Sequence, residues 1–248
     1  LYLQVAALHA AFDDPAEADV QVREALRPVF LLWPAMPEAL EFLERRHAER
    51  DDFDGLAAAW EALVEATTER EARVDLLLRL ASLYEVRFDD AARAKGARER
   101  AAALDPGRAE AVLPLLEQLR EEGRIAEQAR LLERYLAGSP AAARQPELHL
   151  HLAELYLDSL AEPARARVHL EEAIALDPGN ARAHELLEPM LARDPAALSR
   201  LLEARAERSV EAGEKADLLL RAAQLRPAAA IDLLSRALGL APDRADVA

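Results

Sequence analysis

Residues 79–107 read RLASLYEVRFDDAARAKGARERAAALDPG, and residues 151–179 read HLAELYLDSLAEPARARVHLEEAIALDPG. The two stretches are offset by 72 residues without a gap, and 14 of their 29 aligned pairs are identical. The identical pairs include Leu80/Leu152, Tyr84/Tyr156 and Pro106/Pro178. Self-similarity at a fixed spacing is typical of chains that are built from tandem copies of one small structural unit.

A shorter unit lies inside this period. Residues 110–138 and 38–66 each read as an apolar helix, a turn that contains Gly and a second apolar helix. Each period of 72 residues therefore holds two helical hairpins of about 36 residues, and such a hairpin buries its apolar face only against its neighbours. We expect a single repeat domain over residues 1–248 with about seven hairpins, near 1–33, 36–68, 73–105, 109–138, 146–177, 181–208 and 212–241.

The composition favours helices throughout. The 248 residues are 52% hydrophobic but only 4% aromatic, and most of the apolar residues are Ala and Leu, which form helices well, whereas strands favour β-branched and aromatic residues. The chain has no Cys, which excludes disulfides and thiolate sites. Its net charge of −15 opposes a phosphate backbone, so we expect no nucleic-acid partner. No apolar run is long enough to predict a membrane span.

The hairpins at 73–105 and 146–177 resemble tetratricopeptide repeats (TPR), in the form of a degenerate, bacterial-type array. That family's pattern has Leu followed by a small residue, then Tyr, later two small residues, and Pro at the end of the unit. The matching residues in this chain are Leu80, Ala81, Tyr84, Ala94, Ala101 and Pro106, and Leu152, Ala153, Tyr156, Ala166, Ala173 and Pro178. Small residues allow the two helices of a hairpin to approach closely, and Pro prevents the second helix from continuing.

The resemblance implies an α-solenoid, a right-handed superhelix in which first helices line a concave groove. On that geometry, the groove residues are Leu78, Ser82, Glu85, Glu117, Arg120, Glu121, Leu150, Glu154, Leu157 and Asp158. These side chains are acidic with apolar patches, so the expected partner is a protein or peptide, basic or in the form of an amphipathic helix. An ordinary solvated helix surface is the alternative interpretation of the same residues.

The histidines and acidic pairs that could suggest a metal site or catalysis have structural explanations. His149 and His151 are two residues apart, so their side chains leave a helix about 200° apart and cannot hold one ion together, and His149 occupies a packing position. The pairs Asp51-Asp52 and Asp89-Asp90 fall in predicted turns, where Asp is a natural N-cap. We therefore predict no catalytic residue, no metal and no cofactor, and no enzyme activity for this segment.

Two functions remain open. The first is a protein-interaction scaffold, and the second is a structural spacer or regulatory region within a larger multidomain protein of signalling or secretion. Neither end of the sequence carries a polar capping repeat, so we expect a fragment of a longer chain, with self-association possible through the uncapped repeats. No signal peptide is visible, and cytoplasm is the default compartment.

Overall fold

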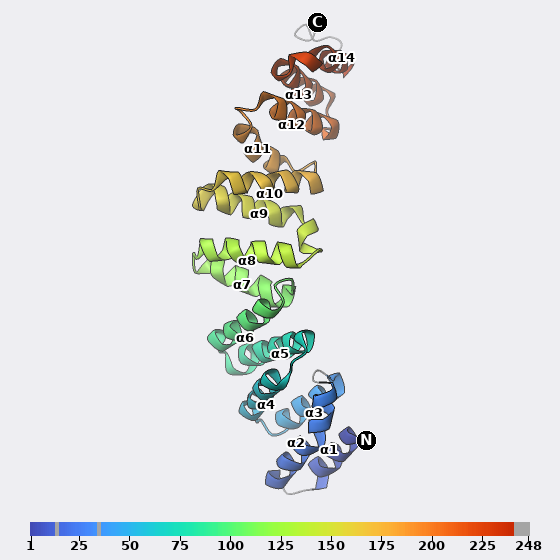
Figure 1. Ribbon diagram of the computed structural model, residues 1–248, viewed down its shortest axis with the longest axis vertical. Helices are drawn as coiled ribbons and strands as arrows, with labels where there is room; N and C mark the ends of the chain where they lie inside the picture. Colours follow the sequence, from blue (N-terminus) through green and yellow to red (C-terminus); the bar gives the residue numbers. More distant parts are fainter. Residues whose placement is uncertain (13–14, 34–35, 241–248) are drawn as a thin grey trace. The chain divides into compact units, whose positions relative to one another are not determined.

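The regular structure of the described residues is entirely helical. The computed structural model describes residues 1–12, 15–33 and 36–240, and the side chains of these residues except 9–12, 15–20, 23 and 31. Over those ranges the chain forms fourteen α-helices and no strand (Figure 1). Within each unit defined below, helices pack in pairs, such as α5 with α6 and α12 with α13. The predicted all-α fold of TPR-like, antiparallel helical hairpins is confirmed. The chain divides into two compact units, Leu1–Glu122 (unit 1) and Gly123–Ala248 (unit 2).

Unit 1 contains seven helices among its described residues. In chain order they are α1 (Tyr2–Phe12), α2 (Pro15–Leu32), α3 (Pro37–Ala48), α4 (Phe53–Ala66), α5 (Arg70–Phe88), α6 (Ala91–Leu104) and α7 (Ala109–Glu121). The first six form three pairs that coincide with the predicted hairpins near 1–33, 36–68 and 73–105. Figure 1 shows the pairs following one another along the chain.

Unit 2 contains the other seven α-helices and three short helical segments. They are α8 (Ile125–Gly138), the 3₁₀-helix η1 (Ala142–Arg144), α9 (Pro146–Glu154), the π-helix η2 (Leu155–Ser159), α10 (Pro163–Leu176), α11 (Ala181–Met190), α12 (Pro195–Arg208), α13 (Ala212–Leu225), the 3₁₀-helix η3 (Pro227–Ala229) and α14 (Ala230–Leu240). The hairpin predicted near 109–138 corresponds to α7 in unit 1 and α8 in unit 2. The last hairpin was predicted to end at residue 241, which lies outside the described residues, and the single domain over 1–248 stays a prediction.

Small residues of the repeat pattern lie at buried positions of the helices. Ala81 of α5 is 1% exposed, and Ala153 of α9 and Ala101 of α6 are fully buried. Tyr84 and Tyr156 are buried beside them. A larger side chain at these alanines would have to displace neighbours that are already packed as densely as in an organic crystal. This explains why the repeat pattern has a small residue at these positions.

Two Asp-Asp turns join the helices of unit 1 by one mechanism. Asp89 follows α5 in the left-handed region, with φ 50°, and Asp90 caps α6 by accepting a hydrogen bond from the Arg93 amide at 2.8 Å. Asp51 has φ 55°, and Asp52 accepts from the Gly55 amide at 2.9 Å at the start of α4. Short polar side chains tolerate the left-handed conformation and satisfy helix N-termini. The predicted turn role of these acidic pairs is confirmed.

The first helix of the fifth repeat does not stay α-helical. It is α-helical to Glu154 and continues as the π-helix η2, whose wide turn is closed by the Leu160 amide donating to the Leu155 carbonyl at 3.1 Å. The turn that follows contains Ala161 with φ 53°. A π turn carries an i→i+5 hydrogen bond and shifts the register of the residues after it. The repeat pattern predicts no such change here.

Candidate functional site

The predicted residues of the third repeat share one face of α5. Leu78, Ser82 and Glu85 are spaced at i, i+4 and i+7, which places them on one side of a helix, while Leu77, Leu80 and the neighbouring Ala81 are buried on the other side. Ser82 and Glu85 are exposed and Leu78 is half-buried. The carboxylate of Glu85 accepts a hydrogen bond from the Arg98 guanidinium of α6. These three side chains therefore share one face of α5, and one of the charges on that face is already paired.

The predicted residues of α7 are exposed, and two of them neutralise each other's charge. Glu117, Arg120 and Glu121 all face solvent. The Arg120 guanidinium donates to both oxygens of Glu117, with Nε at 2.9 Å from Oε2. This hydrogen bond lowers the pKa of Glu117 and raises the pKa of Arg120, so both groups keep their charges and hold each other on one helix surface.

The sequence interpretation missed one residue of this surface. Leu113 of α7 is 46% exposed and lies 35 residues after Leu78, at the corresponding position of the next first helix. The repeat offset alone could have found it. Leu78 of α5 and Leu113 of α7 each place an apolar side chain beside a polar one, Ser82 and Glu117 respectively. We call the seven residues Leu78, Ser82, Glu85, Leu113, Glu117, Arg120 and Glu121 the first-helix face of unit 1.

The predicted residues of unit 2 are divided by the π turn. Leu150 and Glu154 lie one turn apart on α9, and both are half-buried. Leu157, half-buried, and Asp158, exposed, lie on η2, whose wider turn moves them out of the register that a regular helix would give. Glu154 accepts a hydrogen bond from Arg182 Nε of α11 at 3.1 Å. The four residues are therefore divided between a regular α-helix and a π-helix.

Ion pairs join corresponding helices of neighbouring repeats among the described residues, and the seven pairs named below have the same direction. The carboxylate lies in the earlier repeat and the Arg in the later one. Between first helices the pairs are Glu44–Arg79, Asp75–Arg108, Glu154–Arg182 and Glu188–Arg221, and along the second helices they are Glu61–Arg100, Glu133–Arg165 and Glu203–Arg236. Glu203 also pairs with Arg226, the residue that follows the first helix α13. Two further pairs, Lys95–Glu122 and Arg205–Glu214, connect a second helix to the next first helix with the opposite sense.

These pairs change the electrostatic character that the sequence suggests. Exposed pairs contribute about 0–1 kcal/mol each to stability, so their main effect is to neutralise the surface locally. Arg79 and Arg108 bring positive charge onto the first helices of unit 1, at 2.5 Å from Glu44 and 2.6 Å from Asp75. The acidic excess over the first helices is therefore smaller than the count of Glu and Asp residues indicates.

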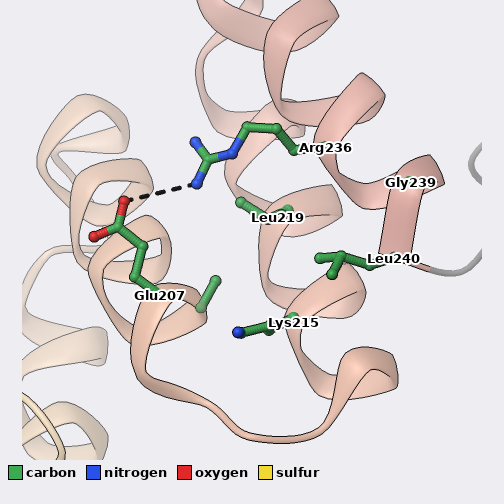
Figure 2. Close-up of a pocket in the computed structure, with 7 residues that line it drawn as sticks. Glu207, Lys215, Leu219, Arg236, Gly239 and Leu240 are labelled. Carbon is green, nitrogen blue, oxygen red and sulfur yellow. Dashed lines mark ion pairs between the residues drawn. The ribbon is translucent and has the colours of Figure 1, made fainter.

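A pocket lies elsewhere, at the last repeat of unit 2 (Figure 2). It has a volume of about 410 Å³ and is lined by Ala206, Glu207, Lys215, Leu219, Arg236, Gly239 and Leu240. Arg236 reaches from α14 toward Glu207 of α12, with 3.7 Å between the charged atoms. The lining residues include no hydroxyl, thiol or imidazole group, and their titratable side chains are Glu207, Lys215 and Arg236. None of the residues predicted from the sequence lies in this pocket.

Among the described residues, no group of three or more His, Cys, Asp or Glu side chains is placed to hold a metal ion. The helices described here are all too short or too polar to cross a bilayer.

Comparison with known proteins bears on the fold. No protein-family model and no curated protein matches the sequence. Among solved structures, the chain is 19% identical to YrrB, a TPR protein with an unusual peptide-binding site, over 77% of this chain and 96% of that one, with a TM-score of 0.39. It is 20% identical to MamA over 75% and 95% of the two chains, with a TM-score of 0.36.

A third similar structure is the C-terminal part of a TPR repeat-containing protein from Cytophaga hutchinsonii, 14% identical over 100% of this chain and 98% of that one, with a TM-score of 0.39. TM-scores of this size give no superposition from which a site could be transferred. The helix bounds, the buried alanines and the repeat offset belong to this chain itself, and they describe a chain of TPR-like helical hairpins.

Proposed function

We propose that this chain is a non-enzymatic scaffold that binds a protein or peptide through its first-helix faces. The observation that carries the proposal is the first-helix face of unit 1, where Leu78 and Leu113 stand at corresponding positions beside exposed polar side chains. Helices bury their other sides against neighbours, so this face is left for contacts with another molecule. Leu150 and Glu154 of α9 are proposed as the equivalent contact in unit 2.

The proposed ligand is a basic, amphipathic helical segment. Its apolar side would contact Leu78 and Leu113, and its basic side would approach Glu117 and Glu121. The lowered pKa of Glu117 keeps that carboxylate ionised in this position. A net charge of −15 favours encounter with basic partners and disfavours nucleic acid.

A display library of basic amphipathic peptides provides a direct test. Wild-type protein, a face variant with Ser82→Arg and Leu113→Glu, and a control with Ala62→Arg and Ala103→Arg are immobilised separately. Ala62 and Ala103 are exposed on the second helices α4 and α6, so the control changes charge without touching the face. Enrichment of the same peptides on wild type and control, and their loss on the face variant, is the expected result. Equal enrichment on all three proteins would exclude this face.

A structural spacer within a larger protein is the second candidate. It is favoured by one observation, the ion pairs that neutralise the first helices from within, such as Glu44–Arg79 and Asp75–Arg108. A spacer would enrich no peptide on the wild-type protein, whether the library is basic or acidic. The same selection therefore separates the two functions.

A further inference from the structure

Two histidines of unit 2 form a hydrogen-bonded pair inside the fifth repeat. The Nδ1 atoms of His149 on α9 and His169 on α10 are 3.2 Å apart, and the ring centroids are 5.4 Å apart. His149 is 7% exposed, and the side chain of His169 is 17% exposed. The ring of His169 also stacks on Tyr156 of η2, with an interplanar angle of 11°. The pair therefore joins α9, η2 and α10, the three elements of this hairpin.

The surroundings determine which nitrogens carry protons. Nε2 of His149 lies 3.2 Å from the Ala143 carbonyl, which can only accept, so Nε2 must be the protonated nitrogen of neutral His149. Nδ1 of His149 is then an acceptor, and Nδ1–H of His169 donates to it. His169 is left with an unprotonated Nε2, 4.0 Å from a carboxylate oxygen of Glu133 on α8.

This arrangement accepts one proton but not two. A first proton can enter at Nε2 of His169 while its Nδ1–H continues to donate to His149. A second proton must go to Nδ1 of His149, and the two N–H groups would then point at each other. We propose that the His149–His169 bond is a pH-sensitive joint, which keeps the hairpin of the fifth repeat closed at neutral pH and opens it when both imidazoles are protonated.

The charges around the pair determine how readily it takes up protons. Burial, and the second imidazole, lower the pKa of His169. Glu133 opposes this effect, but its carboxylate also accepts a hydrogen bond from Arg165 at 2.5 Å, which limits its pull on His169. From α10 itself, Arg165 lowers and Glu172 raises the same pKa.

The remaining elements around the pair hold their charged groups in other contacts. Beside the pair on α9, His151 Nε2 is within 3.3 Å of the Gln128 amide of α8, and on η1 Arg144 is exposed. On α11, which packs against α10, Arg182 pairs with Glu154 and Glu185, and Glu188 pairs with Arg221.

The third repeat shows that the fold does not require this pair. The residues 72 positions earlier are Leu77 and Ala97, both buried. An apolar pair therefore fills the equivalent space in unit 1, with nothing to titrate. The substitution His149→Leu with His169→Ala transfers that solution to the fifth repeat and provides a matched, pH-insensitive variant.

The tautomers can be observed in the wild-type protein. Histidine side chains labelled with ¹⁵N are recorded by NMR at pH 7.5, and the signals of the pair are assigned by their absence from H149L/H169A. We expect the Nδ1–H tautomer for His169 and the Nε2–H tautomer for His149. Two Nε2–H tautomers would overturn the proposal, because neither Nδ1 could then donate.

Opening is measured by amide hydrogen exchange at pH 7.5 and pH 5.0, with rates corrected for the intrinsic effect of pH. We expect the α9 and α10 amides of the wild type to lose at least tenfold more protection than those of α12 and α13. H149L/H169A should show no such difference, whereas His151→Gln, which removes a titratable ring of α9 outside the pair, should keep it. If H149L/H169A does not fold, His149→Gln is used, since its amide can still donate to the Ala143 carbonyl. A pH response that survives loss of the pair, or that is missing from the wild type, would contradict the proposal.

Discussion

The third and fifth repeats fold nearly the same sequence pattern with different local solutions. In the third repeat, α5 continues to Phe88, Asp89 takes the left-handed conformation, and Asp90 caps α6. In the fifth repeat, the first helix widens into η2, Ala161 takes the left-handed conformation, and Glu162 makes no side-chain cap. Both hairpins keep a guanidinium over a tyrosine ring, Arg93 over Tyr84 at 4.6 Å and Arg165 over Tyr156 at 4.5 Å. The two hairpins therefore share the small residues and the guanidinium over the tyrosine ring, and they differ in the conformation and capping of the turn.

Overpacking should have the largest effect and should affect both repeats equally. Ala81→Leu and Ala153→Leu each insert a large side chain where the alanine is at most 1% exposed, and the expected cost is about 1–3 kcal/mol of unfolding free energy. Urea unfolding measures it, with Ala103→Leu at an exposed position of α6 as the control, expected within about 0.5 kcal/mol of wild type. A melting temperature that either substitution leaves unchanged would show that the proposed register is wrong.

Lowering the pH should have the second-largest effect on the free energy of unfolding. Burial lowers the pKa values of His169 and His184 below the ordinary value of 6.5. The unfolded chain therefore takes up protons first as the pH falls, and stability is full above pH 6.5 and decreases below it until the folded-state pKa values are reached, by about 1.4 kcal/mol for each unit of lowering.

Unfolding by urea at pH 7.5, 6.5 and 5.5 measures this decrease. The variant H149L/H169A should lose less stability than the wild type over the same range, because only His184 is left to contribute. Stability that stays constant from pH 7.5 to 5.5 in the wild type would contradict the assignment of these two buried, neutral imidazoles.

A glycine of the third repeat offers a gain of about 1 kcal/mol. Gly96 lies inside α6, and a Cβ built there meets nothing within 4 Å. Gly96→Ala should therefore stabilise the protein by about 1 kcal/mol through helix propensity. Thermal unfolding provides the measurement, and Gly55→Ala is the contrasting variant, since a Cβ at Gly55 would meet the Asp52 carboxylate at 2.1 Å. If the two substitutions changed stability equally, the space available to the new Cβ would not explain their effects.

Substitutions in the turn of the fifth repeat should have the smallest effect on the free energy of unfolding. Ala161 with φ 53° is strained by about 1–2 kcal/mol, part of which glycine loses again through backbone entropy. We expect Ala161→Gly to stabilise by about 0.5–1 kcal/mol, and Glu162→Asp to add about 0.5 kcal/mol by capping α10 as Asp90 caps α6. Chemical unfolding of each variant and of the double variant tests both, and a destabilised Glu162→Asp would show that the π turn prevents the cap from forming.

The helices could be predicted because their ends are encoded locally. Asp89-Asp90 and the Asp-Pro-Gly stretches act within a few residues, so the sequence pattern could indicate where the helices next to them begin and end. The π turn could not be predicted in this way, because Leu155–Ser159 contains no Pro or Gly and reads as regular helix. Its position became visible only with the hydrogen bond from the Leu160 amide to the Leu155 carbonyl.

The candidate site was less predictable, because its contacts are not local. The partners Glu44 and Arg79 are separated by 35 residues, and Glu154 and Arg182 by 28, so no short window contains both. His149 could be given a packing role from its position in the repeat, but its bond to His169 depends on how α9 and α10 pack. Leu113 was the exception, since the offset from Leu78 was available in the sequence.

The common direction of the ion pairs between corresponding helices gives two unlike ends to the repeats that have such pairs on both sides. One end offers carboxylates such as Glu154 and Glu188, and the other offers arginines such as Arg182 and Arg221. A repeat copied and inserted beside its original within a unit would therefore find a charge partner on both sides, whereas an inverted one would place like charges together. Because each such repeat has an acidic end and a basic end, the array is suited to lengthening by duplication of whole repeats.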